Sequence, residues 1–68
     1  GDTLYYAFYS DSGFSGPVEL RGLQARRYEI VDYVNEKSLG IVDAGIPKMK
    51  FNVNRWLLIK AIPLREKN

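Results

Sequence analysis

Six short apolar runs, separated by residues that form turns, constrain the fold of this sequence more than any other feature. The runs occupy residues 4–9, 18–20, 28–34, 38–43, 48–53 and 56–62. None has a helical pattern, and turn-forming residues recur roughly every 8 to 12 positions, a spacing typical of β-sandwiches and barrels. The sequence therefore predicts an all-β fold, a small single-domain antiparallel β-sandwich of about six short strands.

The alternation of apolar and polar side chains indicates which residues face the core. It is clearest in residues 48–53, where Met49, Phe51 and Val53 point inward, because successive side chains of a strand project to opposite faces. Residues 56–62 are apolar almost throughout and are predicted to be buried on both faces, in the middle of the sheet. The predicted core contains Leu4, Tyr6, Phe8, Val18, Leu20, Ile30, Ile41, Phe51 and Leu58.

Polar residues and glycines mark the predicted connections. Residues 10–16 contain two glycines and have Phe14 as their one apolar side chain, so they are predicted to form a loop. Phe14 either stacks on a sugar or a partner, or folds back onto the adjoining strands, and the second interpretation is favoured. Asn35 to Lys37 is predicted to form a tight hairpin connection. Gly40 weakens the strand that follows or lets a neighbour approach.

The chain has 68 residues and no cysteine. A chain of this length supports one core, so residues 1–68 are predicted to be one domain, with residues 3–63 ordered and a charged tail, residues 64–68, that frays. Without disulfides or thiolate metal sites, packing must hold the fold together. Absence of cysteine fits a cytosolic location without excluding secretion. No apolar run approaches the ~18 residues that span a bilayer, so we expect a soluble chain with no membrane partner.

The absence of histidine as well as cysteine excludes most catalytic sites. Neither a nucleophilic triad, nor a histidine base, nor an ordinary zinc site can be built. Glu29, Asp32 and Asp43 are the acids that could serve a glycosidase, which needs two carboxylates ~5 to ~9 Å apart. Acids beside hairpin turns more often bond to local backbone N–H groups. We therefore expect no catalytic residue, no cofactor and no metal in this chain.

Surface aromatic and basic residues are the remaining candidates for binding. Tyr5, Tyr9, Tyr33 and Trp56 could form an aromatic platform for sugar rings or nucleobases. Alternatively, they fill the core or an interface, and this second interpretation is the favoured one. With Phe14, they are the candidate interface or sugar-stacking residues. Lys48, Lys50 and Lys60 could form a basic stripe, but a net charge of +2 does not favour nucleic acid, and lysines commonly protect exposed strands.

Several strings of residues resemble the closing segment of α-galactosidase-type glycoside hydrolases. They are GPVELRGL at residues 16–23, RYEIVDYVN at 27–35, KSLG at 37–40 and WLLIKAIP at 56–63. The resemblance spans nearly the whole chain. Glu36 departs from it, because the family's hairpin typically has glycine after the asparagine, and this suggests a longer or bulged connection.

The resemblance implies a supporting role. In those enzymes this segment is a small antiparallel β-domain that follows the catalytic (β/α)-barrel, and the catalytic carboxylates lie outside it. We therefore expect a non-catalytic accessory domain whose partner is that barrel. The alternatives are a carbohydrate-binding module and a small β-barrel that binds nucleic acid. Edge strands could also support self-association.

Overall fold

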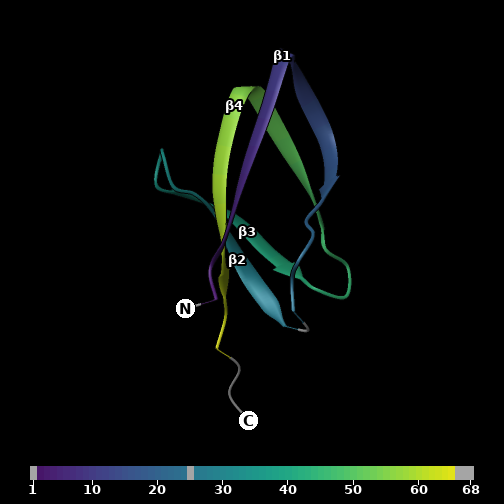
Figure 1. Ribbon diagram of the computed structural model, residues 1–68, viewed down its shortest axis with the longest axis vertical. Helices are drawn as coiled ribbons and strands as arrows, with labels where there is room; N and C mark the ends of the chain where they lie inside the picture. The colour runs from purple at the N-terminus through teal and green to yellow at the C-terminus, as the bar shows by residue number, and fades with distance from the viewer. Residues whose placement is uncertain (1, 25, 66–68) are drawn as a thin grey trace.

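The computed structural model describes residues 2–24 and 26–65, which form one antiparallel sheet of four strands (Figure 1). The strands are β1 (Leu4–Glu19), β2 (Arg27–Asp32), β3 (Lys37–Asp43) and β4 (Lys48–Pro63), and their order in the sheet is β1-β4-β2-β3. The prediction of an all-β, antiparallel fold is confirmed. The prediction of a sandwich of six short strands is not confirmed, because β1 and β4 each contain two of the predicted runs.

β1 and β4 form one long, bent ribbon that passes through two of the predicted turns. They pair from Leu4 opposite Ala61 to Glu19 opposite Lys48, with a shift in register between Ser10 and Phe14. Gly13 and Arg55 adopt positive φ angles of 85° and 76° at this shift. The glycine tolerates such an angle, and a local bulge sharpens the bend of a ladder. The polar segment at residues 10–16 therefore bends a continuous strand instead of ending it, which corrects the predicted loop.

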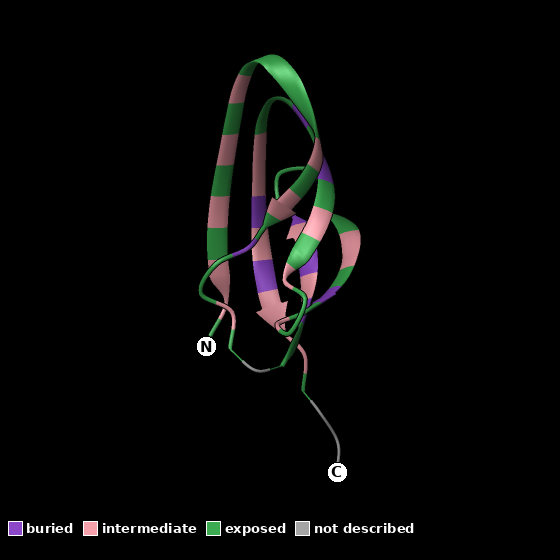
Figure 2. Ribbon diagram, turned by 90° about the vertical axis from the view of Figure 1, so that its right-hand side faces the viewer, coloured by how far each residue is buried: buried purple, intermediate pink, exposed green. Residues whose placement is uncertain are grey.

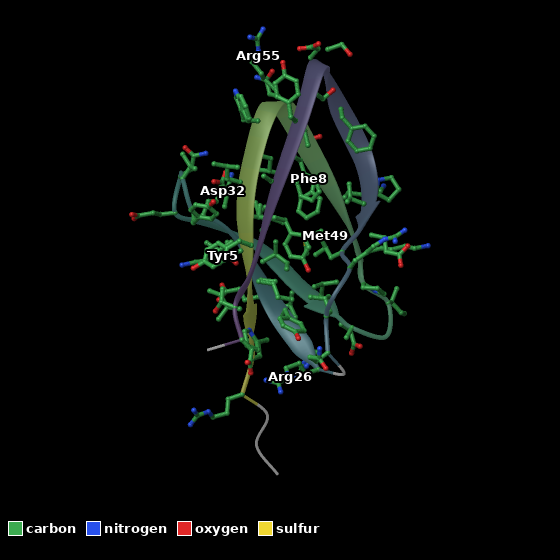
Figure 3. The ribbon with its side chains drawn as sticks, viewed as in Figure 1. Tyr5, Phe8, Arg26, Asp32, Met49 and Arg55 are labelled. Atoms are coloured by element: carbon green, nitrogen blue, oxygen red, sulfur yellow. The ribbon has the colours of Figure 1, made fainter. Side chains whose placement is uncertain are left out.

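The bend folds the sheet over on itself, so that its two halves pack face to face. Figures 1 and 2 show the β1 and β4 ribbon curling over at one end of the molecule. The rings of Phe8 and Phe51 come from different halves, and their centroids lie 5.5 Å apart. Phe8 and Met49 both lie in the space between the halves (Figure 3). The buried core residues are Leu20, Tyr28, Ile30, Val42, Phe51, Val53, Ile59 and Ala61.

Most of the predicted core residues lie on the inner face, and two do not. Leu20, Ile30 and Phe51 are buried, and the partly buried members packed against them are Leu4, Tyr6, Phe8 and Val18. Ile41 was expected inside but is 58% exposed. Leu58 was also expected inside, yet the inward side chains of β4 are its neighbours Leu57 and Ile59. Residues 56–62 were expected to be buried on both faces, but Trp56 is 63% exposed, and Lys60, on the same side as Leu58, lies on the outer face. This corrects the prediction for Leu58.

A connection of four residues joins β2 to β3. It covers residues 33–36, and Glu36 adopts a positive φ of 53°. The longer connection suggested by Glu36 is therefore confirmed. In β3, Gly40 has a φ of 125° and lies opposite Ile30, next to a shift in register. A Cβ atom at Gly40 would lie 3.4 Å from Cε of Met49, an ordinary contact with the end of a flexible side chain, so the backbone angle and not a close approach favours glycine here.

We expect Gly40→Ala to lower the free energy of unfolding by about 1–3 kcal/mol, because side chains rarely adopt its backbone angle. Urea unfolding followed by circular dichroism measures the change. Ser38→Ala, at an exposed position of the same strand, is the matched control and should change stability by less than about 0.5 kcal/mol. Equal effects of the two substitutions would contradict the assigned strain at Gly40.

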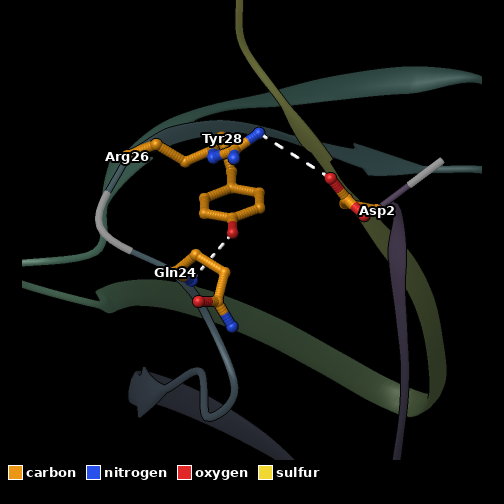
Figure 4. Close-up of polar contacts among 4 residues, drawn as sticks. All are labelled: Asp2, Gln24, Arg26 and Tyr28. Atoms are coloured by element: carbon orange, nitrogen blue, oxygen red, sulfur yellow. Dashed lines mark hydrogen bonds and ion pairs between the residues drawn. The ribbon is translucent and has the colours of Figure 1, made fainter.

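Polar contacts attach the ends of the sheet to the connection between β1 and β2 (Figure 4). The buried hydroxyl of Tyr28 accepts a hydrogen bond of 2.8 Å from the backbone N–H of Gln24, and Arg26 lies 3.9 Å from the carboxylate of Asp2. At the same end of the sheet, the N–H of Leu64 donates to the carbonyl of Arg27 at 2.9 Å. The predicted fraying tail thus begins with a bonded residue, and its residues 66–68 lie outside the described residues.

Candidate functional site

Four of the five candidate aromatic residues lie on one outer face of the sheet. Strand alternation points Tyr5 and Tyr9 of β1 away from the core, and their partners on β4 are Lys60 and Trp56. Tyr33 follows β2 on the other side of β4. The exposed fractions are 65% for Tyr5, 55% for Tyr9, 37% for Tyr33 and 63% for Trp56. The structure thus brings these four candidate residues together on one exposed face of the sheet.

The four rings form two contacting pairs. The ring centroids of Tyr9 and Trp56 lie 4.8 Å apart at an interplanar angle of 59°. Those of Tyr5 and Tyr33 lie 5.6 Å apart in an edge-to-face arrangement that crosses β4. Tyr9 also donates a hydrogen bond to the carboxylate of Asp11, which raises the pKa of the tyrosine hydroxyl, with a smaller contribution from burial.

Aliphatic side chains extend the surface around these rings. We define the outer aromatic face as Tyr5, Tyr9, Tyr33 and Trp56 together with Val31, Ile41, Leu58 and Ile62. Glu29 and Lys60 are the charged side chains within it, since Lys60 lies between Tyr5 and Val31, and Glu29 between Ile41 and Ile62. A contiguous exposed apolar surface of this kind marks a site of interaction.

Phe14 does not belong to this face. It pairs with Val53, which is buried, so its ring is directed to the inner side of the bent sheet. The Cζ atom of Phe14 lies 3.3 Å from the position that a Cβ atom of Gly16 would occupy. The side chain of Phe14 therefore lies over its own strand and remains 45% exposed, so the prediction that it folds back onto the adjoining strands stays a prediction.

Asp32 lies apart from the other two candidate acids, whereas Glu29 and Asp43 are diagonal neighbours on one face of the β2–β3 ladder. Oδ1 of Asp43 accepts a hydrogen bond of 2.7 Å from the N–H of Gly45. Asp32 closes the turn after β2, and Glu29 lies on the opposite face of that strand. Asp32 and Asp43 belong to opposite ends of the β2–β3 hairpin, about 16 Å apart along the strand. That separation is far beyond the spacing of a glycosidase pair, and the predicted local bonding is confirmed for both aspartates.

Asp32 is the buried polar residue among those described. It accepts hydrogen bonds from the N–H groups of Val34 and Asn35, each 3.1 Å, and from Nδ2 of Asn35 at 2.9 Å. The side-chain bond from Asn35 is the main cause that lowers the pKa of Asp32, followed by the bond from the N–H of Asn35. The N–H of Val34 and the charge of Lys37 lower it further, and burial opposes them.

The three candidate lysines do not form a continuous stripe. Lys48 and Lys50 are exposed on the half of the sheet that contains Glu19 and Pro17, their partners on β1. Lys60 lies on the other half, beside Tyr5. Because the halves pack by their inner faces, their outer faces point in opposite directions. The bend that sequence analysis read as a turn between two adjacent strands is the reason for this separation.

A small pocket beside Trp56 was missed by the sequence analysis. It has a volume of about 300 Å³ and is lined by Asp32, Val34, Asn35, Trp56, Leu57 and Leu58. Asp32 followed three residues later by Asn35 was the available signal, since such residues commonly form a bonded turn at the end of a strand. The pocket itself depends on where β2 stops relative to β4, which no local pattern specifies.

Comparisons with known proteins and searches for other sites gave negative results. No family model, curated protein or solved structure matches this chain. Across residues 2–24 and 26–65, there is no cluster of three or more acidic, histidine or cysteine side chains that could hold a metal ion. The same residues contain no helix that is long and apolar enough to cross a membrane.

Proposed function

We propose that this chain is a non-catalytic accessory β-domain of an α-galactosidase-type glycoside hydrolase, which packs against a catalytic (β/α)-barrel and stabilises it. The observation that supports this role is the part of the outer aromatic face around Tyr5 and Tyr33, where Tyr5 is 65% exposed. The strings of residues that resemble the closing segment of those hydrolases support the same role. The two packed halves of the bent sheet would supply the two layers of a small sandwich with six strand segments.

The charges of the face indicate what the partner surface should carry. Lys60 is half-buried between Tyr5 and Val31, and no ion pair joins it to another residue in the described part of the chain. Covering this surface removes water from the Lys60 ammonium group, which is costly unless an opposite charge replaces that water. The barrel surface should therefore be apolar around Tyr5 and Tyr33 and should place a carboxylate opposite Lys60.

The test compares the isolated chain with the natural polypeptide that contains it. The double substitution Tyr5→Ser/Tyr33→Ser removes one aromatic pair from the face. We expect it to lower the melting temperature of the natural polypeptide by about 5 °C or more, and to change the stability of the isolated chain by less than about 1 kcal/mol. Calorimetry measures both quantities. Ile46→Ser, at a 73% exposed position outside the face, is the control and should have little effect on either.

Activity measurements complete this test. The natural polypeptide should hydrolyse aryl galactosides or other aryl glycosides, and the isolated chain should not exceed a buffer blank. Turnover by the isolated chain would overturn the proposal. So would a natural polypeptide with no glycosidase activity, or equal losses of stability from the double substitution in the two contexts.

A further inference from the structure

We propose that the pocket beside Trp56 is a binding site for a single pyranose ring of a neutral sugar. This inference goes beyond the accessory role and does not rest on it, because the pocket lies within this chain alone. Its volume of about 300 Å³ is at the lower end of the range for small-ligand sites, which suits one ring better than an oligosaccharide.

The pocket exists because β2 is shorter than the strand beside it. The ladder between β2 and β4 ends with Asp32 opposite Ile59, whereas β4 continues toward the bend. The connection between β2 and β3 then projects away from the sheet, as the teal loop in Figure 1 shows. Residues 56–58 of β4 have no ladder partner on this side among the described residues, so their backbone edge and side chains line a recess.

Apolar groups supply a surface on which a sugar ring can stack. The indole of Trp56 is 63% exposed, and its contact with the ring of Tyr9 at 4.8 Å restricts its orientation. Val34 and Leu58 contribute aliphatic walls. The C–H groups on one face of a pyranose form an apolar surface that packs on such a ring, while its hydroxyls remain free for polar contacts. A rigid indole also loses little conformational entropy on binding.

The polar residues Asp32 and Asn35 also line the recess, and Asp32 lies opposite Ile59 on the inner side of the sheet, while Trp56 lies on its outer side. The carboxylate of Asp32 accepts three hydrogen bonds within the turn, and an ionised carboxylate has about four acceptor positions. Oδ2 accepts only one of the three, so it retains capacity for a sugar hydroxyl. The same turn fixes the Asn35 amide next to it. A negative charge here disfavours phosphate-bearing ligands, and a neutral sugar therefore fits better than a nucleotide.

The single tryptophan makes the site directly observable, because Trp56 is the only tryptophan of the chain. The 68-residue chain is titrated with the methyl α-pyranosides of galactose, glucose and mannose, and indole fluorescence is recorded. We expect a saturable change with a Kd in the millimolar range for at least one of the three. Adenosine monophosphate is the comparison ligand, because its base can stack on the indole but its phosphate is negatively charged. It should bind more weakly than the sugars.

Two alanine variants distinguish specific binding at this site from nonspecific binding to other exposed aromatic residues. Binding is detected by saturation-transfer NMR on the sugar. Trp56→Ala should weaken binding about tenfold or more, as expected for the loss of one stacking platform. Phe14→Ala removes an aromatic side chain of similar exposure from the other side of the sheet and should leave binding unchanged. Circular dichroism confirms that both variants are folded.

Three results would overturn the sugar site. They are no saturation with any of the three pyranosides, an equal loss of binding in Trp56→Ala and Phe14→Ala, and tighter binding of the nucleotide than of every sugar. None of them bears on the accessory role, which is tested by stability and hydrolysis of the natural polypeptide.

Discussion

Ile59→Ala is expected to lower the free energy of unfolding by about 2–5 kcal/mol, the range for removing most of a buried aliphatic side chain. Ile59 is fully buried at the centre of β4, with Tyr6 opposite it on β1 and Asp32 opposite it on β2. Small domains have a total stability near the low end of about 5–15 kcal/mol. The substitution should therefore leave a large fraction of the protein molecules unfolded even without urea.

Urea unfolding followed by circular dichroism measures this loss, and Ile41→Ala is the matched control. Ile41 is also an isoleucine within a strand but is 58% exposed, so its replacement should cost less than about 1 kcal/mol. Comparable losses at the two positions would show that Ile41 lies inside the protein, contrary to the packing described above.

Asp32→Asn is expected to remove a pH-dependent part of the stability at the end of β2. Because the pKa of Asp32 is lowered in the folded state, the ionised carboxylate stabilises the fold above its ordinary pKa of about 3.9. That contribution is lost as the pH falls through the lowered pKa. Unfolding free energies measured at pH 7 and at about pH 2.5 should therefore differ more for the natural sequence than for Asp32→Asn.

The same position should also be sensitive at neutral pH. Asp32→Ala leaves the N–H groups of Val34 and Asn35 without their acceptor, and we expect a loss of about 1–3 kcal/mol. Asp43→Ala is the comparison, since that carboxylate accepts one hydrogen bond at an exposed turn, and its loss should be smaller. A stability of Asp32→Ala equal to that of the natural sequence at pH 7 would contradict the role assigned to this carboxylate.

The features that alternation determines were predictable from the sequence. The inward set Met49, Phe51 and Val53 follows from period-two patterning, and the structure places all three on the inner face. The aromatic platform of Tyr5, Tyr9, Tyr33 and Trp56 was among the alternatives, because odd-numbered residues of the first run share a side. The inward set was predicted correctly because strand geometry alone assigns side chains to a face.

Other features depend on relations between distant segments, and the sequence does not reveal them. Gly13 and its polar neighbours are suited both to a loop that ends a strand and to a bulge that bends a continuous strand. Pairing with β4 on both sides of this segment makes it a bend. Leu58 was assigned to the core because its run was expected to be buried on both faces, although Lys60, on the same side of the strand, lies on the outer face. The pocket at Trp56 depends on the unequal lengths of β2 and β4, which is a property of the assembled sheet.

The pairing of β1 with β4 also determines how the protein must assemble during synthesis. Leu4 pairs with Ala61 in the sheet. The start of β1 therefore cannot pair with β4 until nearly the whole described chain has been synthesised. Such distant pairing slows folding, because the entropy of closing a long loop is lost before any contact compensates for it. During translation, the inward rings of Tyr6 and Phe8 would therefore stay uncovered until Pro63 has left the ribosome.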